Sequence, residues 1–223
     1  MRNSFRILFA LGVVVVMMLS CKKDNYLSGG SLHNPITQLN NMDYLKGNAF
    51  RLFDTAAVII ERLNLVSEVN SAKTFFAFTD YSILNTINSR LTARQGLNPA
   101  ATYTLDSLIK DINADSVRQY MFNETIELET TAELKATPYT SLGKTTMGVI
   151  KQLTTDAIYL TRTQAPTYLL FFVKIRGDVD EPGVIPPLNE NDIRVQCQTT
   201  GIKTSNGATT MHVLVNPHQF VRF

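Results

Sequence analysis

The sequence contains few of the residues and motifs on which catalytic and metal sites depend. Only two of its 223 residues are cysteines and three are histidines, whereas zinc sites need several such side chains close together. It has no Gly-x-Ser-x-Gly turn of a serine hydrolase, no glycine-rich phosphate loop and no dinucleotide-binding fingerprint. A hydrolase would require His212 to be exposed in a cleft beside a serine or a carboxylate. We therefore expect a protein without enzymatic activity, cofactor or metal.

An excess of charge of one sign is also absent. The formal net charge is +2, and two of the 21 basic residues are Arg2 and Arg6, so the rest of the chain has 19 basic and 19 acidic residues. It has no basic stripe interleaved with aromatic residues, which excludes nucleic acid as the expected partner. With 44% hydrophobic and 18% charged residues, the composition is typical of a globular protein.

The apolar run near the N-terminus is too short to serve as a membrane span. It covers residues 7–19, only 13 positions, whereas a spanning helix needs roughly 20 apolar residues. The run follows Arg2 and Arg6, and a basic start before a short apolar segment is typical of a signal peptide. We expect residues 1–20 to be such a signal.

The residues at the end of this signal, Met18-Leu19-Ser20-Cys21, resemble the lipobox of bacterial lipoproteins. The resemblance implies that Cys21 carries lipid, such as palmitate, and becomes the mature N-terminus. The alternative is an ordinary secretory signal with a chance cysteine. Several acyl chains would make the attachment stable, because one chain alone binds only reversibly. Lys22-Lys23-Asp24 resembles surface-export signals, so we expect a lipid anchor in the outer membrane of the cell envelope, with the folded part outside the cytoplasm.

Residues 21–35 are expected to form a flexible tether, because they are rich in Gly, Ser and Asn and contain few large apolar side chains. Residues 36–223 then form one domain. If Cys21 carries lipid, Cys197 has no partner for a disulfide. Since it lies in the alternating run 193–197, we expect a buried, inert thiol.

Helical periodicity dominates the first half of this domain. Asp54 is expected to cap the first helix, and Thr104 the third. Thr79 or Asp80 is expected to cap the second helix, in which Leu84 should face the core. The expected helices cover residues 54–63, 80–91, 105–112 and 115–121.

Residues that favour strands dominate the second half. The run 168–173 is apolar at every position, so both of its faces should be buried. Residues 178–192 hold three prolines and five acids and are expected to form an exposed loop between two strands. Helices followed by strands indicate an α+β fold with segregated elements. The expected strands cover residues 74–78, 125–128, 146–153, 158–163, 168–175, 193–197 and 211–215.

Three segments, in order along the chain, resemble the signatures of fasciclin-like domains. The first is the strand-to-helix run 74–80, the second is the short segment around Tyr120, and the third is Asn206-Gly207 followed by His212. The match is divergent, since Phe78 stands where the family usually has proline. The residues that carry the resemblance are Thr74, Phe76, Thr79, Asp80, Tyr120, Asn206, Gly207 and His212.

The resemblance implies one fasciclin-like domain, with N-terminal helices packed on a C-terminal β-sandwich or wedge. It also implies an extracellular module for cell adhesion or binding, anchored to the membrane, whose partner is a protein or a glycan. The alternative is an accessory lipoprotein of an outer-membrane nutrient-uptake complex that binds glycans or peptides. Exposed aromatics along a groove would favour this alternative, and a flat apolar patch would favour protein partners.

The signature residues have the chemistry of structural positions. Thr79 and Asp80 offer side-chain oxygens suited to capping a helix. Gly207 suits a turn that needs positive φ. His212 lies in an apolar run and is expected to be a hydrogen-bonded core histidine.

Two weaker signals lie at the expected loop 178–192. Arg176-Gly177-Asp178 spells a tripeptide that animal integrins recognise, and we interpret it as a coincidence. The acids of the loop could gather around calcium, but they lack the fixed spacing of a calcium-binding loop. A solvated acidic loop is therefore expected.

Overall fold

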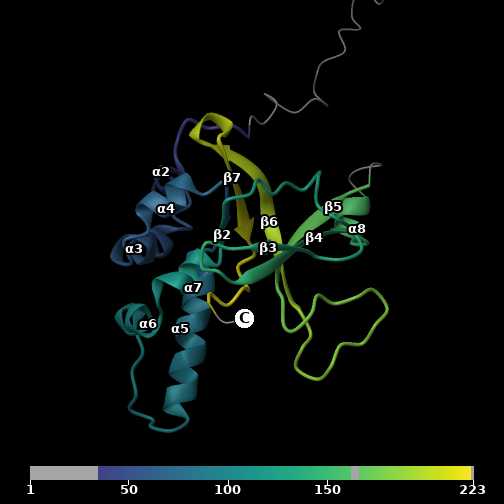
Figure 1. Ribbon diagram of the computed structural model, residues 1–223. Helices are drawn as coiled ribbons and strands as arrows, with labels where there is room; N and C mark the ends of the chain where they lie inside the picture. Colours follow the sequence, from purple (N-terminus) through teal and green to yellow (C-terminus); the bar gives the residue numbers. More distant parts are fainter. Residues whose placement is uncertain (1–34, 162–165, 222–223) are drawn as a thin grey trace, which may run out of the picture. The chain divides into compact units, whose positions relative to one another are not determined.

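Helices occupy most of the first half of the described chain and strands most of the second, which is the α+β arrangement (Figure 1). The computed structural model describes residues 35–161 and 166–221, which belong to the unit Pro35–Phe223. The helices are α2 (Asn41–Lys46), α3 (Asp54–Arg62), α4 (Val66–Ser71), α5 (Asp80–Gln95), α6 (Leu105–Asp111), α7 (Ala114–Arg118), α8 (Ala157–Leu160) and the 3-10 turn η2 (Ser205–Gly207). The strands are β1 (Thr74–Ala77), β2 (Met121–Phe122), β3 (Thr137–Thr140), β4 (Thr146–Leu153), β5 (Tyr168–Lys174), β6 (Ile193–Thr204) and β7 (Thr209–Leu214).

The strands form one mixed sheet in the order β2-β1-β7-β6-β5-β4-β3. Neighbours are antiparallel except β1 and β7, which are parallel. The two outermost strands approach each other, because the N–H of Leu142, just after β3, donates to the carbonyl of Met121 in β2 at 2.9 Å. The sheet is therefore nearly closed. Where the resemblance implied a sandwich or wedge, hydrogen bonds join all the strands into this single curved sheet.

The core lies inside the curve of the sheet and between the sheet and the helices. The ring of Phe76 in β1 stacks on that of Phe172 in β5, with centroids 4.5 Å apart, although β7 and β6 lie between these strands in the sheet. The contact is possible because the sheet curls. Helices α2 to α7 lie together on one side of the sheet (Figure 1). Burying one phenylalanine contributes roughly 1.5–3 kcal/mol, so these rings supply a large share of the stabilisation.

Two of the predicted strands are wrong. Residues 125–128 form no strand, because the N–H of Ile126 donates to the hydroxyl of Thr74 and its carbonyl faces the ring of His212. Side chains thus take the place of a neighbouring strand. The predicted strand 158–163 begins instead as α8, in which the N–H of Ile158 donates to the carboxylate of Asp156 at 2.9 Å. Residues 162–165 lie outside the described residues.

Several element boundaries also differ from the sequence prediction. Elements α2, α4, β2 and β3, none longer than six residues, were not predicted. Strand β6 continues to Thr204, beyond the predicted end at residue 197. Helix α7 begins after its cap Asn113 and ends at Arg118, so Tyr120 follows the helix. Leu84 was expected in the core, but its side chain is 50% exposed.

Candidate functional site

The first and third signature segments come together in adjacent parallel strands. β1 and β7 pair so that Thr74 lies opposite Thr210 and Phe76 opposite His212. The rings of Phe76 and His212 stack with their centroids 5.1 Å apart. Both side chains are fully buried. This part of the signature therefore belongs to the core.

His212 is held in one neutral form. Its Nδ1 accepts a hydrogen bond from the N–H of Gly201 at 3.3 Å, so the proton is on Nε2, which donates to the carbonyl of Ile126 at 2.9 Å. Burial lowers the pKa of His212 to about 4, which leaves the ring uncharged at neutral pH. The expected hydrogen-bonded core histidine is confirmed. A catalytic base would have to be exposed, and His212 is not.

Two other parts of the signatures organise the backbone. The hydroxyl of Thr74 donates to the carbonyl of Glu124 at 2.7 Å and accepts from the N–H of Ile126 at 2.9 Å. Asn206 and Gly207 have φ of 57° and 91° in the turn between β6 and β7. The expected positive φ of Gly207 is confirmed, and such left-handed geometry favours glycine and asparagine.

Thr79 is the cap of α5. Its Oγ1 accepts a hydrogen bond from the N–H of Ser82 at 3.4 Å, which selects Thr79 from the two predicted candidates. The same hydroxyl donates to Oδ1 of Asn216 at 3.1 Å. This bond connects the start of α5 to the segment after β7. Thr79 is fully buried, so its role is structural.

Asp80 caps a different helix from the one in which it lies. Its Oδ1 accepts from the N–H groups of Thr55 and Ala56 at 2.9 and 3.0 Å, and these groups belong to the first turn of α3. The predicted cap of α3, Asp54, is wrong: Phe53 occupies the cap position and makes no side-chain capping bond. A carboxylate from a distant part of the sequence performs this role, and local spacing could not reveal it.

Tyr120 and His218 form a buried pair. The Tyr120 hydroxyl lies 2.8 Å from Nε2 of His218 and accepts from the N–H of Val221 at 3.1 Å. Burial raises the pKa of Tyr120 and lowers that of His218 to about 4. The sequence gives no indication of this pair, since the partner of His218 is 98 residues earlier. Tyr120, the residue of the second signature segment, thus holds the C-terminal segment in place.

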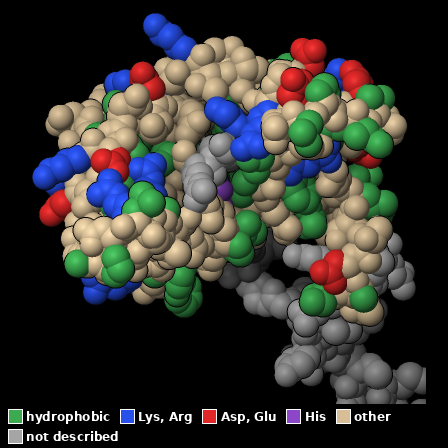
Figure 2. Space-filling model, turned by 90° about the horizontal axis from the view of Figure 1, so that it is seen from below, with side chains coloured by type: hydrophobic (Ala, Val, Ile, Leu, Met, Phe, Trp, Pro, Cys, Tyr) green, Lys and Arg blue, Asp and Glu red, His purple; other side chains and the backbone are tan. Residues whose placement is uncertain are grey.

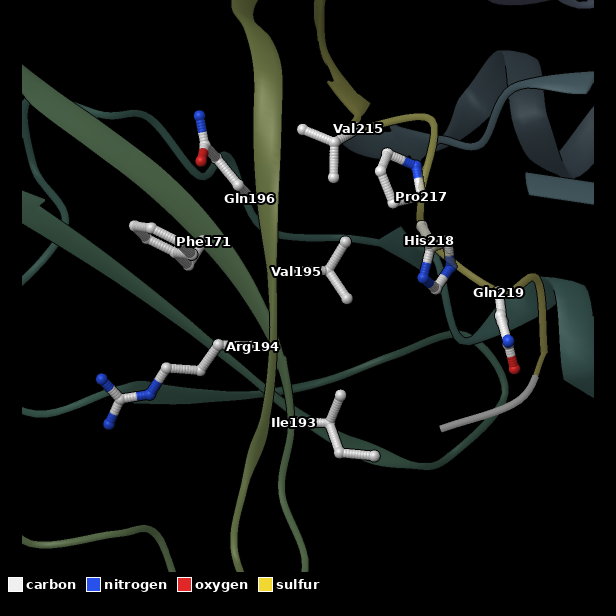
Figure 3. Close-up of a pocket in the computed structure, with 9 residues that line it drawn as sticks. All are labelled: Phe171, Ile193, Arg194, Val195, Gln196, Val215, Pro217, His218 and Gln219. Carbon is white, nitrogen blue, oxygen red and sulfur yellow. The ribbon is translucent and has the colours of Figure 1, made fainter. Parts of the chain in front are cut away.

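A groove of about 500 Å³ lies beside His218, between β5, β6 and the segment after β7 (Figure 3). Figure 3 shows Val195 between the β6 backbone and His218, with Arg194 and Gln196 on the opposite side of the strand. Among the lining residues that the structure describes, none has a serine, cysteine or carboxylate side chain. These residues therefore offer no nucleophile or acid to the histidine.

The loop between β5 and β6 is exposed, as predicted, and fixed at its base. The carboxylate of Asp192 accepts from the N–H groups of Arg176 and Asp180 at 3.0 and 3.1 Å. The Arg-Gly-Asp tripeptide lies at this base. The tip carries three large apolar side chains whose exposed fractions are unusually high: Val184 at 62%, Ile185 at 93% and Leu188 at 88%.

A second hollow, of about 330 Å³, lies where the turn before α3 meets the start of α5. Phe50 and Tyr81 are among its lining residues, and they are 82% and 52% exposed. Leu84, also in the lining, is the residue that was expected to face the core. Arg51 and Asp80 supply charged groups of opposite sign to the same hollow. The sequence did not indicate this site, because the residues before α3 follow no periodic pattern.

The described residues hold no cluster of the kind that binds metal. Nowhere in residues 35–161 and 166–221 do three or more His, Cys, Asp or Glu side chains gather suitably. Cys197 is buried, as predicted, and burial raises the pKa of its thiol. Figure 2 shows one face on which hydrophobic side chains form separate patches between Lys, Arg, Asp and Glu.

The predicted signal, lipidation site and tether lie outside the described residues, except for Pro35 at the end of the tether. Cys21 and the run 1–20 are therefore not placed. Among the helices that the structure describes, none has the length and apolar character needed to cross a membrane.

The chain was compared with known proteins. It matches no family model and no curated protein.

Proposed function

We propose that this chain is a lipoprotein anchored in the outer membrane through lipid on Cys21, and that residues 36–223 form a divergent fasciclin-like module for adhesion or binding. The anchor is supported by the lipobox-like residues that end in Cys21. The module is supported by the meeting of the first and third signatures in β1 and β7. Their side chains stabilise the scaffold, which leaves recognition to the exposed loops.

The loop between β5 and β6 carries the binding part of the proposal. Val184, Ile185 and Leu188 are all more than 60% exposed, and burying each in a complex would contribute roughly 1.5–3 kcal/mol. The carboxylate of Asp192 holds the two ends of the loop together. A loop with a fixed base loses less conformational freedom on binding than a free one. Its apolar tip suits the surface of a protein partner.

A second candidate function is ligand capture for nutrient uptake at the outer membrane. The observation that favours it is the hollow lined by Phe50 and Tyr81, whose side chains are exposed and which also has Arg51 and Asp80 in its lining. Exposed aromatics in a hollow fit a glycan better than they fit a flat protein surface.

The anchor is tested by the variant Cys21→Ser. Membranes should retain the wild-type chain after a high-salt wash, and mass spectrometry should show acylated Cys21 at the mature N-terminus. The serine variant should move to the soluble fraction. Equal membrane retention of both proteins would contradict the anchor, whatever the module binds.

The binding role is tested with whole cells that do or do not produce the chain. They are applied to surfaces coated with a panel of extracellular proteins and glycans. Cells with the chain should adhere better to at least one protein surface, and the triple variant Val184→Ser/Ile185→Ser/Leu188→Ser should remove the difference. The matched control is Leu97→Ser/Leu134→Ser, which removes side chains that are 92% and 80% exposed elsewhere. Equal adherence to every surface with and without the chain would contradict adhesion.

A further inference from the structure

The hollow before α3 presents the two most exposed aromatic side chains among those described. Phe50 is 82% exposed and Tyr81 is 52% exposed. Leu84 lies one turn further along α5 and is 50% exposed. These three side chains give the hollow an apolar wall. Its volume of about 330 Å³ lies at the lower end of the roughly 300–1,000 Å³ range of small-ligand pockets.

The backbone that presents Phe50 is fixed before any ligand arrives. The N–H of Phe50 donates to Oδ1 of Asn48 at 3.1 Å, and the N–H of Arg51 donates to the carbonyl of Asn48 at 2.9 Å. The N–H of Asp80 donates to the carbonyl of Leu52 at 2.8 Å, which ties this turn to α5. Arg51 has φ of 53°, a left-handed conformation that is uncommon outside glycine. Because the turn is already ordered, binding need not order it.

The lining of the hollow also includes polar and charged side chains. Nε of Arg51 donates a hydrogen bond to Oδ2 of Asp54 at 2.6 Å, and the guanidinium has further N–H groups. Asp80 uses Oδ1 for the first turn of α3, and its Oδ2 makes no hydrogen bond to another described residue. Thr55 adds a hydroxyl to the lining. The described lining contains one cation and one anion, and the ion pair with Asp54 places a second carboxylate beside Arg51, so these charges favour a neutral ligand over an anionic one.

These features select a ligand with an apolar face and a polar edge. A pyranose ring has this character, because its axial C–H groups form a face that stacks on an aromatic ring and its hydroxyls project from the edge. Hydroxyls both donate and accept, so they can bond to the carboxylate of Asp80 and the guanidinium of Arg51 together. A peptide that binds by strand addition fits less well, because it needs a free strand edge. The lining comes from the turn, from the first turn of α3 and from the first two turns of α5, and the carboxylate of Asp80 already accepts from two N–H groups of α3.

We propose that the hollow formed by Phe50, Arg51, Asp80, Tyr81 and Leu84 binds a sugar ring of a neutral glycan. The inference rests on the proposed binding function. It names the ligand class for the second candidate, which is ligand capture for nutrient uptake. Phe50 and Tyr81 stack on the ring, and Arg51 and Asp80 bind its hydroxyls.

The test uses the full chain, purified in a detergent without a sugar headgroup. Calorimetry measures the binding of cello-, malto-, xylo-, manno- and chito-tetraose. The chain contains no tryptophan, so Tyr81→Trp keeps an aromatic ring in the hollow and places the only tryptophan of the variant there. At least one tetraose should bind to the wild type and change the fluorescence of the tryptophan variant. Phe50→Ala/Tyr81→Ala should weaken that binding at least tenfold.

The control is Leu97→Ala/Leu134→Ala, which removes exposed apolar side chains outside the hollow and should leave the affinity unchanged. Because Phe50 and Tyr81 are exposed, their alanine variant should keep the wild-type melting temperature, and the melt checks this. Failure of every tetraose to bind, or equal affinity of wild type and alanine variant, would overturn the proposal. Loss of cell adherence to a protein surface in the same variant, without any saccharide binding, would also overturn it and assign the hollow to a protein. The anchor and the loop are tested separately, so they can stand if this inference fails.

Discussion

His212 and His218 are buried in the neutral form, and this makes the stability of the fold depend on pH. The pKa of each is lowered to about 4, in both cases chiefly by burial. The unfolded chain takes up protons near the ordinary pKa of about 6.5, whereas the folded chain resists protonation until about pH 4. The stabilisation is therefore fully present above pH 6.5 and is lost as the pH falls toward 4.

We expect the free energy of unfolding to fall between pH 6.5 and pH 4 by up to about 1.4 kcal/mol per pH unit for each of the two histidines. His218→Gln should remove one of these contributions and reduce the slope. Urea denaturation at pH 7, 6, 5 and 4.5 measures it. Thr104→Ala is the control: it removes the side-chain cap of α6, which bonds to Ser107 and to neither histidine, so it should cost about 1 kcal/mol at every pH and keep the slope. A His218→Gln slope equal to that of the wild type would contradict the assignment.

The two histidines also show what the sequence reveals at this scale. His212 lies in an apolar run, and the prediction of a buried, hydrogen-bonded side chain is confirmed. His218 has no such context, and its bond to Tyr120 spans 98 residues. Phe50 was missed for a related reason. It lies in a turn, where exposure depends on how α3 and α5 meet and not on a repeating pattern.

At the scale of single elements, the N-terminus of α3 depends on a carboxylate from another helix. We expect Asp80→Ala to lower the free energy of unfolding by roughly 0.5–2 kcal/mol, the usual cost of losing a capping side chain. Asp54→Ala should change it by less than about 0.5 kcal/mol, because Asp54 makes only an exposed ion pair with Arg51. Guanidinium denaturation of both variants measures the difference. If Asp54→Ala lost more unfolding free energy than Asp80→Ala, the capping role would belong to Asp54, as the sequence predicted.

Long periodic segments were the most predictable elements. The strand predicted at residues 146–153 is confirmed as β4, and Thr104 caps α6 as expected. Residues 125–128 look equally suited to a strand, but their backbone bonds go to Thr74 and His212. The strand preference of these residues is overridden because distant side chains supply their hydrogen-bond partners.

At the scale of the whole molecule, the curl of the sheet brings β1 and β5 into contact through Phe76 and Phe172. We expect Phe76→Leu and Phe172→Leu to be non-additive, with a coupling energy of about 0.5–1.5 kcal/mol in a double-mutant cycle. Chemical denaturation of the two single variants and the double variant measures it. Phe53→Leu with Phe76→Leu is the control pair, since both rings are buried and the described residues show no ring contact between them. Equal coupling in both pairs would argue against a direct stack.

The hydrogen bond between Leu142 and Met121 has a consequence for molecules crowded on one surface. Open sheets have edge strands whose free backbone groups recruit a second chain and start aggregation. Here the outermost strands face each other, and β3 also carries Pro138, which lacks an N–H to donate. Copies held side by side on a membrane, as proposed, would then meet through side chains and could be packed densely without strand exchange.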